Sequence, residues 1–232
     1  MGKKFIIVSL VVCVIISFVV FAQDVFIGKR LYTYDIIAKK DFLKKIWYSN
    51  LSDESFQKFI GVGHPFSNVE YEPLDLVYLQ WLYHISAQTK HQLREEAALK
   101  LEELAMDFYE EFWANVVIVS AYRSYWYQKN SISKSCKESW WCAKEWESEH
   151  QLWLAVDLWE TTNEKNFLVK YQKYYDRLHD NAHKYWFHQS FQNGREIDGY
   201  YIEPRHWRYL WVELATKLYE NNISFTQYVF NV

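Results

Sequence analysis

Glycine is scarce in this sequence. The 232 residues include 6 glycines beside 12 tryptophans, whereas glycine usually makes up about 7% of a chain, or roughly 16 residues at this length. An excess of basic charge is also missing, because 26 Lys and Arg face 29 Asp and Glu and the charges are interspersed. Without a basic field the sequence predicts no nucleic-acid partner. No internal repeat is visible, and one domain is the expectation for this length.

The N-terminus carries the one long apolar run of the chain. Lys3 and Lys4 precede an uncharged stretch from Phe5 to Phe21, and Ala22 follows at a position typical of signal-peptidase sites. We therefore expect residues 1–23 to be a signal peptide or a membrane anchor and the chain to leave the cytoplasm. Cleavage and retention both stay open, because the run lies at the short end of the roughly 17 to 25 residues that span a bilayer.

Cysteine is also rare, with 3 residues in the chain. Cys13 lies inside the apolar run, which leaves Cys136 and Cys142 as a pair in an oxidising compartment. A small loop disulfide and two free thiols are both compatible with this spacing, because spacing alone does not fix the geometry of a disulfide.

Residues 24–66 are charged and aromatic and end near a break at Gly61–Pro65. We interpret them as an N-terminal extension, a spacer whose deletion should leave activity intact, and residues 67–232 as the main domain. Within that domain the pattern predicts an α+β fold, a small antiparallel sheet flanked by helices. The expected elements are a helix through Leu93–Phe108, strands at Val116–Tyr122 and Leu154–Leu158, a helix at 164–185, strands near Phe187 and at Tyr200–Tyr209, and a helix at Val212–Asn222.

Three short strings, at residues 120–128, 148–158 and 203–210, concentrate the residues that carry chemistry. His150, Asp157 and His206 supply two imidazoles and a carboxylate, which leave the fourth position of a tetrahedral zinc open, as catalytic zinc sites require. Because His150 and Asp157 are too far apart on any straight element to share one ion, the chain must bend between them.

Further polar residues surround these expected ligands. Glu203 lies three residues before His206 and is the expected general base, which later passes its proton to the leaving amine. Arg123 offers a planar guanidinium suited to the terminal carboxylate of a peptide. Gln128 and Ser148 are expected to make secondary polar contacts with the substrate.

These strings resemble the VanY-type D-alanyl-D-alanine carboxypeptidases, relatives of the VanX dipeptidases and of hedgehog-like zinc folds. The family pattern S-x-H-x-x-G-x-A-x-D followed by E-x-x-H falls on Ser148, His150, Ala155, Asp157, Glu203 and His206, and Arg123 matches the arginine of S-x-Y-R-S. The resemblance covers about Tyr71 to Tyr228. It implies a Zn²⁺ cofactor, a hedgehog-like zinc fold, and removal of the terminal D-alanine from peptidoglycan stem peptides outside the cytoplasm, by a protein that is secreted or anchored facing the wall.

Two alternatives to this function stay open. L,D-carboxypeptidases, which cut the tetrapeptide instead of the pentapeptide, share the same pattern. A non-catalytic relative that binds the cell wall is the other alternative, since aromatic residues make up 20% of the chain.

The chain departs from the family pattern where it shows tryptophan in place of glycine, at Trp113, Trp146, Trp153, Trp186 and Trp211. We hypothesise that the source cell reads UGA as glycine and that these codons were translated as tryptophan. Five genuine tryptophans are the other reading.

Two rival motifs are weaker. His179 and His183 have the i, i+4 spacing of a helical metal pair, but no glutamate follows His179 as in H-E-x-x-H. Ser131 and Lys134 match the S-x-x-K of serine acyl enzymes, but the partner K-T-G string is absent.

Overall fold

A computed structural model describes residues 48, 51–68, 71–79, 84–86, 90–136, 142–160 and 172–231. All of them belong to one compact unit, Trp47–Val232. The expected signal or anchor segment, residues 1–23, lies outside the described residues. None of the helices in the described ranges combines the length and the apolar character needed to cross a bilayer.

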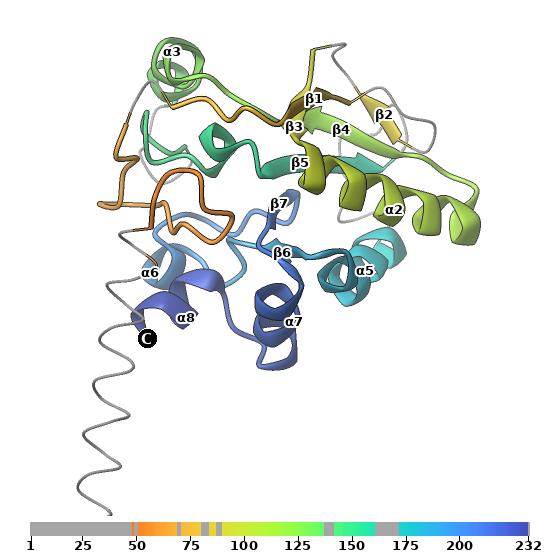
Figure 1. The fold of residues 1–232 in the computed structure, drawn as a ribbon. Helices are drawn as coiled ribbons and strands as arrows, with labels where there is room; N and C mark the ends of the chain where they lie inside the picture. The colour runs from red at the N-terminus through yellow and green to blue at the C-terminus, as the bar shows by residue number, and fades with distance from the viewer. Residues whose placement is uncertain are drawn as a thin grey trace, which may run out of the picture. The chain divides into compact units, whose positions relative to one another are not determined.

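A five-stranded sheet forms the centre of the domain (Figure 1). Its order is β2 (His84–Ser86), β4 (Val116–Ser120), β5 (Ala155–Glu160), β7 (His206–Tyr209) and β6 (Phe187–Gln189). All pairings are antiparallel except that of β2 with β4, which is parallel. Two further strands, β1 (Leu76–Tyr78) and β3 (Gln92–Arg94), form a separate antiparallel ladder. The predicted α+β class with small antiparallel sheets is confirmed.

Helix α2 (Glu95–Phe112) follows β3 and runs alongside β4 in Figure 1. Its apolar residues recur every three or four positions, as the sequence predicted, and they pack into one core with Val116, Ile118 and Leu158. Glu95 and Glu96 in the first turn complement the helix dipole. The buried residues of α2 are Ala97, Ala98, Leu101, Leu104, Ala105 and Phe108.

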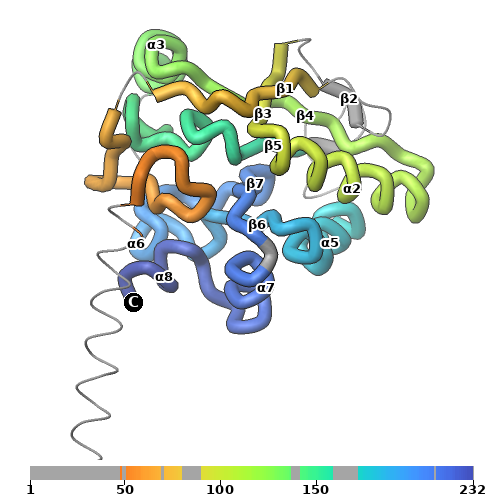
Figure 2. Tube along the Cα trace, in the orientation of Figure 1, coloured from red at the N-terminus to blue at the C-terminus, as the bar shows by residue number. Residues whose placement is uncertain are grey.

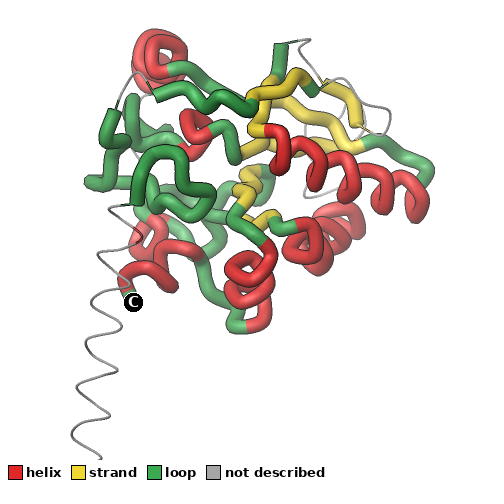
Figure 3. The backbone as a smooth tube through the Cα atoms, viewed as in Figure 1, coloured by secondary structure: helices red, strands yellow, loops and turns green. Residues whose placement is uncertain are grey.

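The other helical segments are short and lie between the strands or after them (Figure 3). They are α3 (Tyr125–Tyr127), the π-helix η1 (Gln128–Ser133), the 3₁₀ turns η2 (Glu149–Leu152) and η3 (Ala182–Tyr185), and the α-helices α5 (Gln172–Asn181), α6 (Arg195–Asp198), α7 (Val212–Glu220) and α8 (Phe225–Phe230). The helix expected at 164–185 is found as α5 and η3 from residue 172 onward.

The strand expected at Tyr200–Tyr209 is shorter than predicted and covers only His206–Tyr209. The preceding residues run as a loop after α6 and the left-handed Gly199 (φ +81°). Pro204 has no N–H to donate to a neighbouring strand, which accounts for the late start of the ladder. This loop matters for the site because it carries Glu203.

Residues 51–66, part of the segment assigned to an extension, are packed into the domain. They form loops (Figure 3) but bury Phe59, Ile60 and Phe66. The Phe59 ring lies 5.5 Å from that of Phe225 and 4.9 Å from that of Phe230, and Figure 2 shows this orange stretch beside the blue C-terminal helices.

Buried charged side chains also hold residues 51–66 against the rest of the domain. Arg208, fully buried in β7, donates from Nη2 to the carbonyls of Phe56 and Lys58, both at 3.1 Å. The Lys58 ammonium, 1% exposed, pairs with Asp53 at 3.1 Å. Because a buried charge is costly unless its donors are satisfied, this segment supplies groups that the rest of the domain requires.

Candidate metal centre

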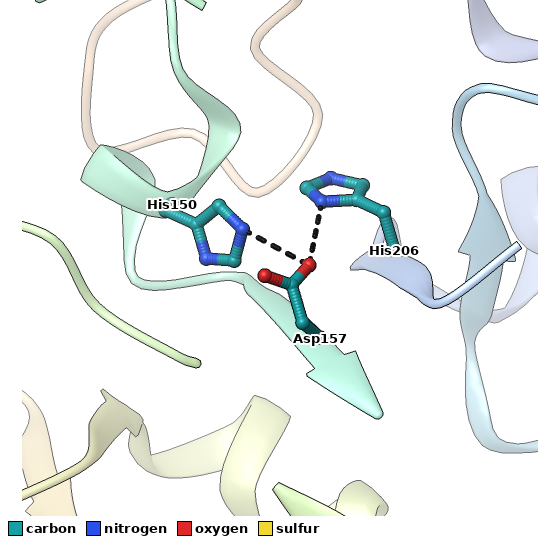
Figure 4. Close-up of side chains that lie close together, drawn as sticks. All are labelled: His150, Asp157 and His206. Atoms are coloured by element: carbon teal, nitrogen blue, oxygen red, sulfur yellow. Dashed lines mark hydrogen bonds and ion pairs between the residues drawn. The ribbon is translucent and has the colours of Figure 1, made fainter. Parts of the chain in front are cut away.

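Three side chains from three different elements meet beside the interior strand pair β5–β7 (Figure 4). His150 comes from η2, Asp157 from β5 and His206 from β7. Asp157 and His206 face each other directly across the antiparallel β5–β7 pairing. The predicted bend between His150 and Asp157 lies at Trp153, which ends η2 in the left-handed conformation (φ +57°). From there the chain continues into β5.

The donor atoms are spaced for a small cation. Nε2 of His150 lies 3.2 Å and Nδ1 of His206 lies 3.3 Å from Oδ1 of Asp157, and one donor atom from each residue lies within 4.8 Å of the others. Ligands bound tetrahedrally to zinc at their usual bond lengths stand about 3.3 Å apart. Across the described ranges, this is the only cluster of three such residues that could hold a metal, and its geometry fits zinc.

In each histidine, the ring nitrogen that points away from Asp157 makes a hydrogen bond that determines the neutral tautomer. Nδ1 of His150 lies 2.6 Å from the carbonyl oxygen of Ala121, and Nε2 of His206 lies 2.8 Å from Oε2 of Glu149. Both acceptors require N–H donors, so the opposite nitrogen of each neutral ring presents a lone pair toward Asp157. The two histidines would therefore bind a metal through different atoms, His150 through Nε2 and His206 through Nδ1.

The surroundings of His150, His206 and Asp157 shift their pKa values in different directions. Burial, and then the charge of Arg123, lowers the pKa of His150 to about 4, so this ring is neutral. Although burial opposes it, hydrogen bonds to Asp157 and Glu149 raise the pKa of His206 to about 10. Against burial, the contacts of Asp157 with His150, His206 and Arg123 hold its pKa well below the ordinary value. Metal binding would therefore release the proton of His206.

Glu149 is a functional residue that sequence reasoning missed. Its Oε2 accepts hydrogen bonds from His206 and from the Ser190 hydroxyl at 2.6 Å, and its Oε1 lies 3.3 Å from Nη1 of Arg208. Although burial opposes it, the charge of Arg208 and then the contact with His206 lower the pKa of Glu149 to about 2. A signal was present, because Glu149 adjoins His150 and Arg208 shares the strand face of His206.

We expect Glu149→Gln to weaken zinc binding by about 10- to 100-fold, the usual effect of removing a carboxylate behind a ligand histidine. The amide can still accept from His206, but it no longer balances the buried charge of Arg208. A competition titration with a chromophoric chelator measures the change, and Glu145→Gln, outside this network, should leave the affinity unaltered. Equal zinc affinity in both variants would show that Glu149 does not support the ligand.

A cleft of about 230 Å³ opens onto the two histidines. Arg123, Ser148 and Glu203 line it, so the structure gathers these residues around the two histidines that are expected to bind the metal. Burial, and then the negative charge of Asp157, raises the pKa of Glu203 above its ordinary value. A raised pKa makes a carboxylate easier to protonate, which suits a group that takes up a proton and returns it.

Arg123 and Gln128 have more structural roles than the sequence suggested. Arg123 donates from Nη2 to Oδ2 of Asp157 at 2.7 Å and from Nε to the Ser120 hydroxyl at 2.9 Å. Gln128 is buried and does not line the cleft; its Nε2 donates to the carbonyl of Ala143 at 2.7 Å. Since Ala143 does line the cleft, Gln128 supports its wall.

The pairing of Cys136 and Cys142, left open by the sequence, is a disulfide in the structure. Cys142 and the neighbouring Ala143 both line the cleft. The disulfide therefore holds one side of the cleft.

The rival motifs do not form sites of the kind proposed for them. The His183 ring stacks on Tyr219 at 3.9 Å and the His179 ring lies 6.0 Å from the same residue. Ser131 and Lys134 are both exposed. Ring packing explains the two histidines, and contact with solvent explains Ser131 and Lys134.

Two histidines and an aspartate that could hold a metal, with a glutamate in the cleft beside them, define the class of zinc metallopeptidases. The sequence pattern of the VanY family, described as D-alanyl-D-alanine carboxypeptidase, matches residues 90–212. The chain belongs to this family.

Two relatives place the chain more closely. It is 32% identical over 171 residues to YodJ of Bacillus subtilis, named as a carboxypeptidase, covering 68% of this chain and 61% of YodJ. It is 33% identical over 90 residues to a D-alanyl-D-alanine carboxypeptidase of Enterococcus faecalis, covering 38% of this chain and 32% of that protein. The chain thus spans less than two thirds of the length of either relative.

Solved structures share the fold. The LD-carboxypeptidase LdcB superimposes with a TM-score of 0.65 at 28% identity, over 76% of this chain and 86% of that one. VanYB in complex with D-alanine-D-alanine gives a TM-score of 0.55 at 24% identity, over 74% of this chain and 95% of that one.

Proposed function

We propose that this protein is a zinc carboxypeptidase that removes the C-terminal D-alanine from peptidoglycan stem peptides. The observation that carries the proposal is the cluster of His150, Asp157 and His206, whose two histidines line the same cleft as Glu203. When bound, zinc supplies Lewis acidity to the cleft: it polarises a peptide carbonyl and lowers the pKa of a water molecule. The VanY family supports D-alanine as the residue removed.

Glu203 takes the proton of the attacking water and returns it to the departing amine. Arg123 recognises the terminal carboxylate of the substrate, for which its Nη1 has no competing partner within the described residues. Ser148 contributes a hydroxyl at the cleft wall. Gln128 contributes to substrate binding through the wall that it supports.

The bond cut has two candidates. D,D-cleavage of the pentapeptide follows from the family, whereas the similarity to LdcB, named an LD-carboxypeptidase, favours L,D-cleavage of the tetrapeptide. A purely wall-binding role has less support, because the three expected metal ligands lie together and Glu203 lines the cleft beside them.

We also propose that the protein acts outside the cytoplasm, either secreted or held at the membrane by residues 1–23. The Cys136–Cys142 disulfide supports an oxidising location. We place the start of the catalytic domain near Trp47, with residues 24–46 as the extension, because residues 51–66 contribute to the core.

Mass spectrometry of D-alanine release from stem pentapeptide and tetrapeptide tests the function. We expect zinc-loaded protein to release D-alanine from at least one of them, to lose this activity in a chelator, and to regain it when zinc is added back. The preferred peptide identifies the bond. No release from either peptide by folded, zinc-bound protein would favour the wall-binding role instead.

A further inference from the structure

The residues with positive φ in this structure fall into three types. Within the described ranges they are Gly63, Gly194 and Gly199, the asparagines Asn222 and Asn231, and the tryptophans Trp113, Trp146, Trp153, Trp186 and Trp211. Glycine enters this region freely and asparagine does so with little penalty, whereas a bulky L-residue is a genuine outlier there. Five tryptophans in such positions need a common explanation.

Three of the five tryptophans end helical segments. Trp113 ends α2, Trp153 ends η2 and Trp186 ends η3, each in the left-handed conformation with its N–H donating to a carbonyl of the preceding turn. This is the helix C-cap geometry in which glycine is the usual residue. The side chain contributes nothing to the cap, because the hydrogen bond is made by the backbone.

Trp211 shows the same requirement more strongly. It precedes α7 with φ +80° and ψ +150°, a backbone region that is essentially restricted to glycine. Trp146, at φ +59°, lies in the loop before His150, where its N–H donates to Oε1 of Gln151 at 2.6 Å and its carbonyl accepts from the Phe66 N–H at 2.8 Å. Backbone hydrogen bonds thus hold that conformation.

The remaining described tryptophans behave differently. Trp126 lies in α3, Trp159 in β5 and Trp207 in β7, all with ordinary helical or extended backbone. Positive φ is therefore not a property of tryptophan in this chain. The tryptophans separate into two groups, and only one occupies glycine-type backbone.

We infer that the native protein carries glycine at positions 113, 146, 153, 186 and 211, because its source cell reads the UGA codon as glycine. The backbone supports this inference independently of the proposed function and of the family pattern. It also agrees with the composition, in which glycine is too rare and tryptophan too common.

Position 153 shows what the exchange means for the site. The Trp153 side chain is 1% exposed, stacks on Tyr122 at 3.8 Å, and leaves its Nε1 without a partner among the described residues. A glycine there would make the turn between His150 and Asp157 without burying an indole whose Nε1 has no partner among the described residues. The bend that assembles the metal site would then be free of conformational strain.

Peptide mass spectrometry of the protein isolated from its source cells tests the inference directly. We expect glycine at all five positions and tryptophan at positions 126 and 207. Tryptophan at the five positions in the native protein would overturn the inference, as would UGG codons there in the gene.

A matched pair of variants tests the backbone argument. Trp113 and Trp126 are both exposed, 81% and 65%, but one is left-handed and the other helical. Urea unfolding of the protein with the printed sequence should show that Trp113→Gly lowers the unfolding constant by about 5- to 30-fold. Trp126→Gly should raise it by about 2-fold.

If Trp113→Gly raises the unfolding constant as Trp126→Gly does, position 113 does not require glycine and the argument fails. Should the printed sequence not fold, the comparison is made in protein carrying all five glycines. Restoring tryptophan at position 113 should then raise the unfolding constant by the same 5- to 30-fold factor.

Discussion

Replacing Glu203 with glutamine lowers kcat for D-alanine release by about 10²- to 10⁴-fold, the range that general acid–base catalysis usually contributes. The amide keeps the size of the side chain but can neither accept the proton of the water nor return it to the amine. Glu203 is not one of the expected metal ligands, so the variant should still bind zinc. Its kcat is measured by quantifying released D-alanine under saturating substrate.

Glu196→Gln provides the control for this experiment. Glu196 is an exposed carboxylate on the neighbouring helix α6, and its loss should leave kcat unchanged. The general-base assignment is wrong if Glu203→Gln retains the kcat of the unaltered protein while it binds zinc.

Removing residues 1–66 should unfold the domain, whereas removing residues 1–46 should leave its stability unchanged. The longer deletion takes away the buried side chains of Tyr48, Phe59 and Ile60, and losses of this kind cost about 2 to 5 kcal/mol each. It also removes the Phe56 and Lys58 carbonyls that satisfy Arg208. The sum, roughly 10 kcal/mol, equals the whole stability of a typical domain.

Thermal unfolding followed by circular dichroism compares the two truncated proteins. The 1–46 deletion is the matched control, since it ends before the compact unit begins at Trp47. A cooperative transition at the same temperature for both proteins would show that residues 47–66 are the dispensable spacer that the sequence suggested.

The sequence predicted the elements whose signals are local. The period of α2, the apolar runs of β4 and β5, and the spaced motifs around His150 and His206 all depend on neighbouring residues. The strand expected before His206 failed because the aromatic run at Tyr200–Tyr201 resembles a strand, while its pairing depends on Pro204 and on a turn after α6.

Other parts of the site depend on contacts that no local pattern reveals. The network of Glu149 with Arg208 joins residues 59 positions apart, and Arg208 contacts Lys58 across 150 positions. The loops of residues 51–66 carry no helical or strand period, so only the folded structure shows that they are buried. The disulfide likewise needed the folded geometry, because its spacing was compatible with free thiols.

The Arg208 contacts also set the order in which the domain can assemble. The carbonyls of Phe56 and Lys58 accept hydrogen bonds from Arg208, which lies 152 and 150 residues later in the chain. Closing loops of this length is slow, and contacts distant in sequence delay folding. The first segment of the domain therefore stays exposed until β7 is available to pair with it, and the domain gains protection only when this contact between distant segments has closed.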